Sequence, residues 1–90
     1  MNQHLTVPVI RAAIDEADNI FLKALATRFR AVRHLKEIKR ETGMQIESPS
    51  REAELKDKWK KKAQELDLPR ELTLLILDFI LAESKRIQAA

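Results

Sequence analysis

The chain has 90 residues, no cysteine and a formal net charge of +3 at pH 7. A chain this short fits one domain and buries only about 60% of its unfolded surface, so assembly with a second copy is a natural means of stabilisation. The lack of cysteine excludes a disulfide framework and thiolate zinc sites and fits the cytoplasm. No apolar run approaches the roughly 18 residues of a membrane span and no signal segment is recognisable, so we expect no membrane partner.

The first helix is expected to begin near Thr6, a capping residue placed before Pro8, and to run to about Thr42, where Gly43 suits a C-terminal cap. Along it, apolar residues recur in steps of four and three, the spacing of a buried helical seam. The seam comprises Ile10, Ile14, Ala17, Phe21, Ala24, Arg28, Ala31, Leu35 and Ile38. At 1.5 Å per residue the helix spans roughly 50 Å, so the two shorter helices of its own chain cannot bury it.

Arg28 occupies a seam position where an apolar side chain is expected. Burying an unpaired charge costs several kcal/mol, so this arginine either pairs with a carboxylate such as Glu52 or Asp18, or binds an anionic ligand. Lys39 follows eleven residues later, within roughly 20° of the same helix face. Arg11 precedes Arg28 by 17 residues and is rotated from it by about 100°, so any site that Arg11 serves belongs to a partner chain.

The second helix is predicted to begin at Ser48 and Pro49 and to run to about Glu65 with a thin apolar face. Arg51 and Glu52 lie in its first turn. This region carries a basic run between Lys56 and Lys62 that lies beside Glu52, Glu54, Asp57 and Glu65. We interpret the run as a solvated helix face rather than a nucleic-acid site, because only four aromatic residues are available for base stacking.

Asp67 and Pro69 are expected to open the third helix. Its apolar stripe comprises Leu72, Leu75, Ile76, Phe79, Ile80 and Ile87. Ser84 and Gln88 lie one turn apart and present two uncharged polar groups together, although residues near a chain end are often fraying surface. Since β signals are absent, the fold class is all-α, with one long and two shorter helices in a single domain over residues 1–90.

The chain shows no nucleophile beside a base and no cluster of metal ligands. His4 and His34 stand alone, and we interpret both as surface residues. Lys39, taken by itself, has the alternative interpretation of a solvated lysine. The sequence therefore predicts a site made of cations and neutral polar groups, without a metal or a cofactor.

Seven of these residues together resemble the signature of the all-helical chorismate mutases. The matching residues are Arg11 in the opening Ile10 to Asp18, Arg28, Lys39, Arg51, Glu52, Ser84 and Gln88. Where well-known members carry an aspartate three residues before the Arg-Glu pair, this chain has Ser48. We expect Ser48 to cap the second helix, and it could also hydrogen-bond the substrate or play no part in binding. The resemblance covers roughly residues 9 to 88 and implies a long helix, a loop and two shorter helices entwined as a homodimer.

The resemblance also implies the conversion of chorismate to prephenate in phenylalanine and tyrosine biosynthesis. This Claisen rearrangement breaks an ether C–O bond as a C–C bond forms, with no proton transfer, covalent intermediate, metal or cofactor. By resemblance, Arg28, Arg51 and Arg11 of the partner subunit bind the substrate carboxylates, with Ser84 assisting. Lys39 and Gln88 would face the ether oxygen, and Glu52 and Ser48 the hydroxyl region of the ring.

Two alternative functions are compatible with the same pattern. An isochorismate-pyruvate lyase shares the fold, but those enzymes tend to carry a Pro-Glu-Arg order after the loop, whereas this chain reads Ser50-Arg51-Glu52. A non-catalytic helical dimerisation module, with Arg28 in a structural ion pair, is the second alternative. Such a module would gain no thermal stability from a transition-state analogue of the mutase reaction.

Overall fold

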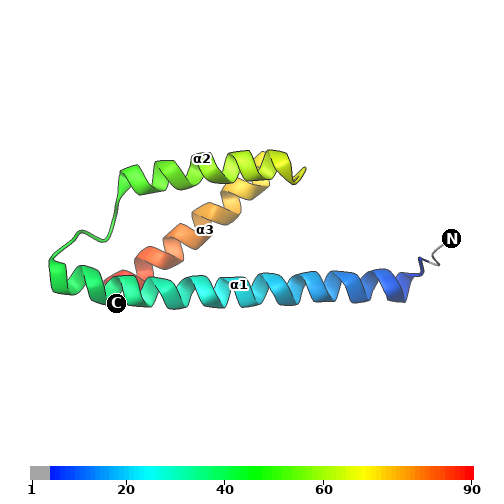
Figure 1. Cartoon of the computed structure of the whole chain (residues 1–90), viewed down its shortest axis with the longest axis horizontal. Helices are drawn as coiled ribbons and strands as arrows, with labels where there is room; N and C mark the ends of the chain where they lie inside the picture. The colour runs from blue at the N-terminus through cyan, green and yellow to red at the C-terminus, as the bar shows by residue number, and fades with distance from the viewer. Residues whose placement is uncertain (1–4) are drawn as a thin grey trace. The chain divides into compact units, whose positions relative to one another are not determined.

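The computed structural model describes residues 5–90, which form three α-helices and no strand (Figure 1). The helices are α1 (Val7–Thr42), α2 (Pro49–Glu65) and α3 (Arg70–Ala89). The prediction of an all-α fold with one long and two shorter helices is therefore confirmed, and the helix limits agree closely with those expected. His4 lies outside the described residues. None of the described helices is long and apolar enough to cross a membrane.

Local capping explains both ends of α1. The Thr6 hydroxyl accepts a hydrogen bond from the Val9 N–H at 3.3 Å, which satisfies one of the free amides of the first turn. At the other end, Gly43 adopts a positive φ of 71°, and the Met44 N–H donates to the Lys39 carbonyl at 3.0 Å. This is the bonding pattern of a helix that ends at a left-handed residue.

The end of α2 corrects one expectation about the chain. Asp67 has a positive φ of 56°, and the next N–H, that of Leu68, donates to the Ala63 carbonyl at 2.8 Å. Asp67 therefore closes α2 in the way that Gly43 closes α1, and the prediction that it opens α3 is wrong. The helix α3 instead follows Pro69, whose carbonyl accepts the Thr73 N–H at 3.0 Å.

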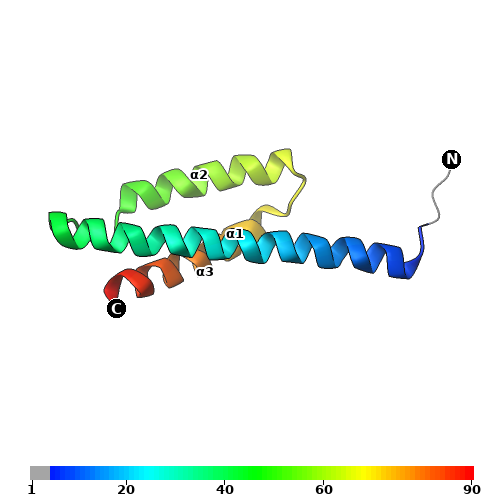
Figure 2. The ribbon, with the colours of Figure 1, turned by 60° about the horizontal axis from the view of Figure 1, so that its bottom comes forward.

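The chain divides into two compact units, one ending at Ala31 and one spanning Val32–Ala90. The first unit contains the N-terminal part of α1. The second contains the last turns of α1 together with α2 and α3, which pack against each other and are joined by the turn after Glu65 (Figures 1 and 2). The prediction of a single domain over residues 1–90 stays a prediction.

The inner face of α3 differs from the predicted stripe. Leu77 is fully buried and Ile80 nearly so, whereas Leu72, Leu75 and Phe79 are exposed, Phe79 by 76%. The buried row on α3 consists of Thr73, Leu77, Ile80 and Ser84. The helix is apolar on more than one side, and packing against α2 selects the side that carries the two small hydroxyl residues. The exposed members of the predicted stripe lie outside this buried row in the described chain.

The apolar interior of the described chain is small. Its buried apolar side chains are Val32, Ala63, Leu77 and Ile80. Along the α1 seam, Ile10, Ile14, Phe21, Leu35 and Ile38 are 40% to 53% exposed. A row of large apolar side chains at this exposure is unusual for a protein that works as a monomer. The seam thus remains uncovered in the single chain, as the length argument predicts.

Candidate functional site

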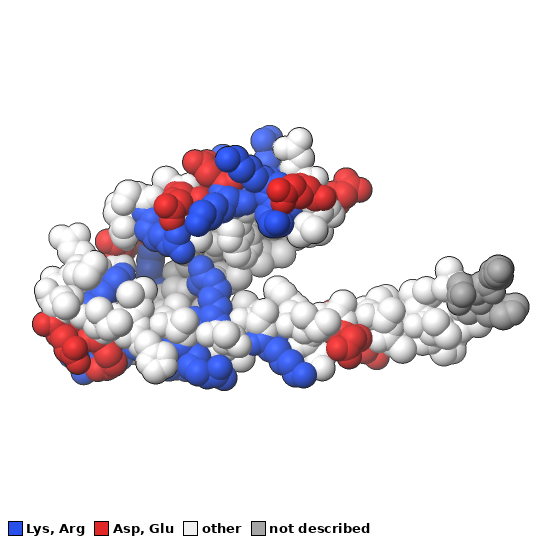
Figure 3. Space-filling model, in the orientation of Figure 1, with Lys and Arg blue, Asp and Glu red and all other residues white. Residues whose placement is uncertain are grey.

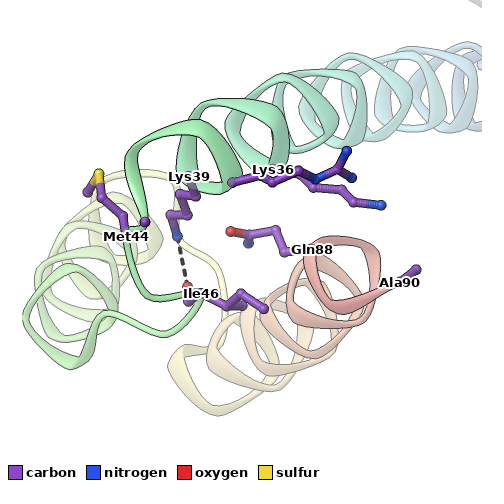
Figure 4. A pocket seen from close by; sticks show the side chains of 8 residues that line it. Lys36, Lys39, Met44, Ile46, Gln88 and Ala90 are labelled. Atoms are coloured by element: carbon purple, nitrogen blue, oxygen red, sulfur yellow. Dashed lines mark hydrogen bonds between the residues drawn. The ribbon is translucent and has the colours of Figure 1, made fainter.

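A pocket of about 310 Å³ opens in the second unit, where the end of α1, the following loop and the last turn of α3 meet (Figure 4). Its lining residues are Lys36, Lys39, Arg40, Gly43, Met44, Ile46, Gln88 and Ala90. Two of the predicted site residues, Lys39 and Gln88, thus line one pocket although they lie 49 positions apart in the sequence. The cap at Gly43 brings this about, because it turns the chain back along the end of α1.

Lys39 is half-buried and held in place by the loop. Its ammonium donates a hydrogen bond to the Ile46 carbonyl at 2.8 Å (Figure 4). An ammonium has three donors, so this contact fixes the side chain at the pocket wall and leaves further donors for a ligand. The alternative interpretation of Lys39 as a solvated lysine is therefore wrong.

Gln88 projects from α3 toward α1 (Figure 4). Its amide nitrogen donates to the Ser84 carbonyl at 3.2 Å, while its Oε1 is buried and has no hydrogen-bond partner among residues 5–90. A buried polar atom without a partner costs about 1–3 kcal/mol, and such atoms are typical of binding or catalytic sites. The second N–H of the same amide remains a candidate donor to a ligand.

Ser84 is buried, with 6% of its surface exposed, and its hydroxyl donates to the Ile80 carbonyl at 2.8 Å. Because α3 remains helical through Ala89, Ser84 and Gln88 keep their spacing of one turn. The alternative that these two residues are fraying surface is wrong.

Glu52 projects from the first turn of α2 and is paired with a residue that sequence reasoning did not single out. The Lys85 ammonium lies 3.1 Å from Glu52 Oε2 and 3.1 Å from Glu47 Oε1. The hydrogen bonds to Glu47 and then to Glu52 raise the pKa of Lys85 above its ordinary value. Lys85 directly follows Ser84, so this ion pair lies beside the polar end of α3.

The two other predicted site residues near the start of α2 make local contacts. Ser48 caps the helix by accepting the Arg51 N–H at 3.4 Å, which confirms its predicted capping role. The exposed Arg51 guanidinium forms an ion pair with Glu54 one turn later. In the chain by itself, neither side chain lines the pocket that holds Lys39 and Gln88.

Arg11 and Arg28 belong to the first unit, in the N-terminal part of α1. Arg11 is exposed and Arg28 is half-buried on the helix surface. Their contribution to the site stays a prediction.

Sequence reasoning also missed Lys36, which lines the pocket together with Lys39. The signal was available, because residues three apart share a helix face. For Lys85 no local signal exists, since its partners Glu47 and Glu52 lie more than thirty positions away in the sequence. A second hollow of about 460 Å³ contains none of the predicted site residues and is lined by Arg33, His34, Lys36, Glu37, Arg86, Ile87 and Ala90.

The arrangement has a definite chemical character. It joins lysine cations to a neutral amide, and no group of three or more potential metal ligands occurs in the described part of the chain. Preorganised cations and N–H donors favour an anion and stabilise negative charge as it develops in a transition state. A site of this kind suits a reaction that needs orientation and electrostatic stabilisation.

Comparison with known proteins agrees with this chemistry. The family model described as chorismate mutase type II matches residues 10–89. A curated chorismate mutase from Methanocaldococcus jannaschii is 32% identical over 79 residues, which cover 88% of this chain and 80% of that protein. No solved structure matches the chain. The chain therefore belongs to the chorismate mutase type II family, and its function is that of a chorismate mutase, an isomerase.

Proposed function

We propose that the chain converts chorismate to prephenate in the pocket bounded by Lys39 and Gln88, as one subunit of a homodimer. The observation that carries this assignment is the convergence of these two residues, from opposite ends of the second unit, on one pocket.

Lys39 and Gln88 act on the ether oxygen of the substrate. As the C–O bond breaks, negative charge grows on that oxygen, and an ammonium and an amide N–H facing it bind the transition state more tightly than the ground state. A donor of this type contributes about 10²- to 10³-fold to the rate. The Lys39 ammonium is preorganised for the task, because the Ile46 carbonyl already holds it at the pocket wall.

The remaining residues select the reactive conformation of the substrate. Arg28, Arg51 and Arg11 of the partner subunit bind the two carboxylates, and Ser84 assists. Glu52 and Ser48 contact the hydroxyl region of the ring. The pseudo-diaxial conformer of the dianion is rare in solution, and these contacts hold the bound substrate in it. This orientation supplies much of the rate acceleration without a covalent step.

The proposed homodimer is supported by the exposed apolar seam of α1. Large apolar side chains on the seam and on the outer side of α3 are 40% to 76% exposed, more than a stable single chain of this size is expected to leave in water. A second copy that covers the seam would bring its Arg11 toward the site of its partner.

We further propose that the enzyme works in the cytoplasm, in phenylalanine and tyrosine synthesis, without nucleic-acid or membrane partners. Basic and acidic side chains are interspersed over α2 (Figure 3), and such a mixed surface does not form the one-sign patch that a phosphate backbone requires.

The test follows chorismate absorbance with the purified protein and identifies the product by chromatography, for the parent and for Gln88→Leu. The parent is expected to form prephenate, and Gln88→Leu to be slower by about 10²-fold or more. Because the substitution removes an unpaired buried oxygen, it should leave the fold stable. Gln64→Leu, an exposed position on α2, is the matched control and should keep the parent rate.

A parent protein that leaves chorismate unchanged would overturn the proposal. Release of pyruvate from isochorismate by the same preparation would then favour the lyase alternative. Parent-like turnover by Gln88→Leu would remove Gln88 from the catalytic site.

A further inference from the structure

Lys85 contacts two carboxylates and has no role in the proposed mechanism. The Lys85 ammonium joins the loop after α1, through Glu47, to the first turn of α2, through Glu52, with both N···O distances at 3.1 Å. We call this three-residue contact the Lys85 bridge. It ties together the loop after α1, the start of α2 and the end of α3, all within the second unit.

Four ion pairs among the described residues are local. The pairs Arg40 with Glu37, Arg51 with Glu54, Lys62 with Glu65 and Arg86 with Glu83 each join residues one helical turn apart on an exposed surface. The Lys85 bridge instead spans three elements, and the Glu52 side chain within it is only 25% exposed. A contact of this kind controls where a carboxylate points.

The bridge occupies one oxygen of Glu52 and leaves the carboxylate a second. Lys85 engages Oε2, and an ionised carboxylate accepts hydrogen bonds at both oxygens. With Oε2 anchored to α3, the remaining oxygen is restricted to a narrow range of directions. A flexible Glu side chain would otherwise lose conformational freedom each time it bound the substrate.

We propose that Lys85 is a positioning residue, which holds Glu52 in the orientation that receives the ring hydroxyl of the substrate. The inference rests on the proposed function of Glu52. Lys85 does not touch the substrate itself, and its effect on the reaction passes through the Glu52 carboxylate.

The experiment compares Lys85→Met with the parent in the chorismate assay, with kcat and KM measured separately. Lys85→Met is expected to lower kcat/KM by roughly 10- to 100-fold, mainly through kcat, because a displaced Glu52 no longer selects the reactive conformer. Arg86→Met is the matched control, since it removes the neighbouring cation of α3 and its ion pair with Glu83 but not a contact with Glu52. The control is expected to keep the parent kcat.

Two further variants separate positioning from a structural role. Lys85→Arg should restore most of the lost kcat, because a guanidinium can also contact two carboxylates. In a Glu52→Gln background, the substitution Lys85→Met should have little additional effect, since an uncharged amide no longer forms the ion pair. The thermal unfolding midpoint of Lys85→Met should stay close to that of Arg86→Met.

The outcomes are distinct. If the parent turns over chorismate and Lys85→Met keeps the parent kcat, the inference is overturned. The proposed function then stays intact. An equal loss with and without Glu52 would also overturn it, because Lys85 would then act by another route. If Glu52→Gln alone falls below detection, failure of Lys85→Arg to recover kcat overturns the inference. Absence of turnover by the parent overturns the proposed function.

Discussion

At the scale of single residues, the hydrogen bonds and ion pairs of each polar group within the chain define the site. Lys39 is held by a carbonyl, Glu52 by an ammonium, and Gln88 by one of its two N–H groups. Each contact uses part of the group's bonding capacity and leaves another part for the substrate. These side chains are thus oriented before binding, which lowers the entropy that the substrate must overcome.

The ion-paired groups Glu83 and Lys85 both have pKa values shifted away from neutrality. The Arg86 guanidinium lowers the pKa of Glu83, so the stability from that pair is present above the unfolded-state pKa and is lost only as acid protonates Glu83. Glu47 and Glu52 raise the pKa of Lys85, so its contribution is present below the unfolded-state pKa and is lost only as pH rises through the raised value. The pH ranges over which these two contributions to stability are lost both lie well away from neutrality.

We therefore expect kcat/KM and the thermal unfolding midpoint to change little between about pH 6 and pH 8. The neutral Gln88 amide, which does not titrate, supports the same expectation for the ether-oxygen contact. The check is a series of rate and unfolding measurements across this range at constant ionic strength. A sharp loss of activity inside it would count against a neutral donor at this position.

At the scale of elements, capping residues set the helix limits, and two left-handed residues end α1 and α2. Gly43 and Asp67 occupy equivalent positions with φ of 71° and 56°. Only Gly adopts this conformation without a steric cost, although Asp tolerates it better than most residues. The left-handed backbone conformation is therefore free of strain at Gly43, whereas the Cβ of Asp67 makes it less favourable there.

Gly43→Ala is expected to destabilise the protein by about 1 kcal/mol, since a Cβ at this φ is strained. The added Cβ would meet no atom within 4 Å, so the loss comes from the backbone and not from a clash. Asp67→Gly is the matched comparison and should not destabilise, because it relieves the same strain at the other helix end. Chemical unfolding at a fixed protein concentration measures both variants, and equal stability of Gly43→Ala and the parent would refute the argument.

At the scale of the whole molecule, the exposed seam and the distribution of the arginines both favour an enzyme completed by a second copy. Arg11 and Lys39 lie on the same helix but 28 residues apart, which at 1.5 Å per residue is about 40 Å. Side chains separated by this distance on an ideal α-helix cannot both reach one small ligand. The proposed site therefore needs Arg11 from the partner subunit.

Subunit mixing tests this arrangement directly. Arg11→Ala and Lys39→Ala should each lose most of their activity, whereas a 1:1 mixture refolded together should recover about a quarter of the parent rate, because half of the dimers then carry one intact site. The control mixes Arg28→Ala with Lys39→Ala, whose mutated residues serve the same site of the same chain, and should show no recovery. Recovery in both mixtures, or in neither, would contradict the shared site.

The amino-acid sequence by itself determined the features that depend on neighbours along the chain. Helix limits followed from caps and breakers such as Thr6, Gly43 and Pro49, and the types of the site residues were sufficient for the family to be recognised. These signals are reliable because caps, prolines and helical spacing act within one or two turns.

Only the tertiary structure decided the features that depend on packing between elements. It selected the inner face of α3, buried Ser84, brought Gln88 to Lys39, and joined Lys85 to Glu47 and Glu52. Sequence periodicity cannot choose between two apolar faces of one helix, and an ion pair between residues more than thirty positions apart leaves no local pattern. Asp67 belongs with these cases, because its left-handed backbone conformation is compatible with either a helix start or a helix end in the sequence alone.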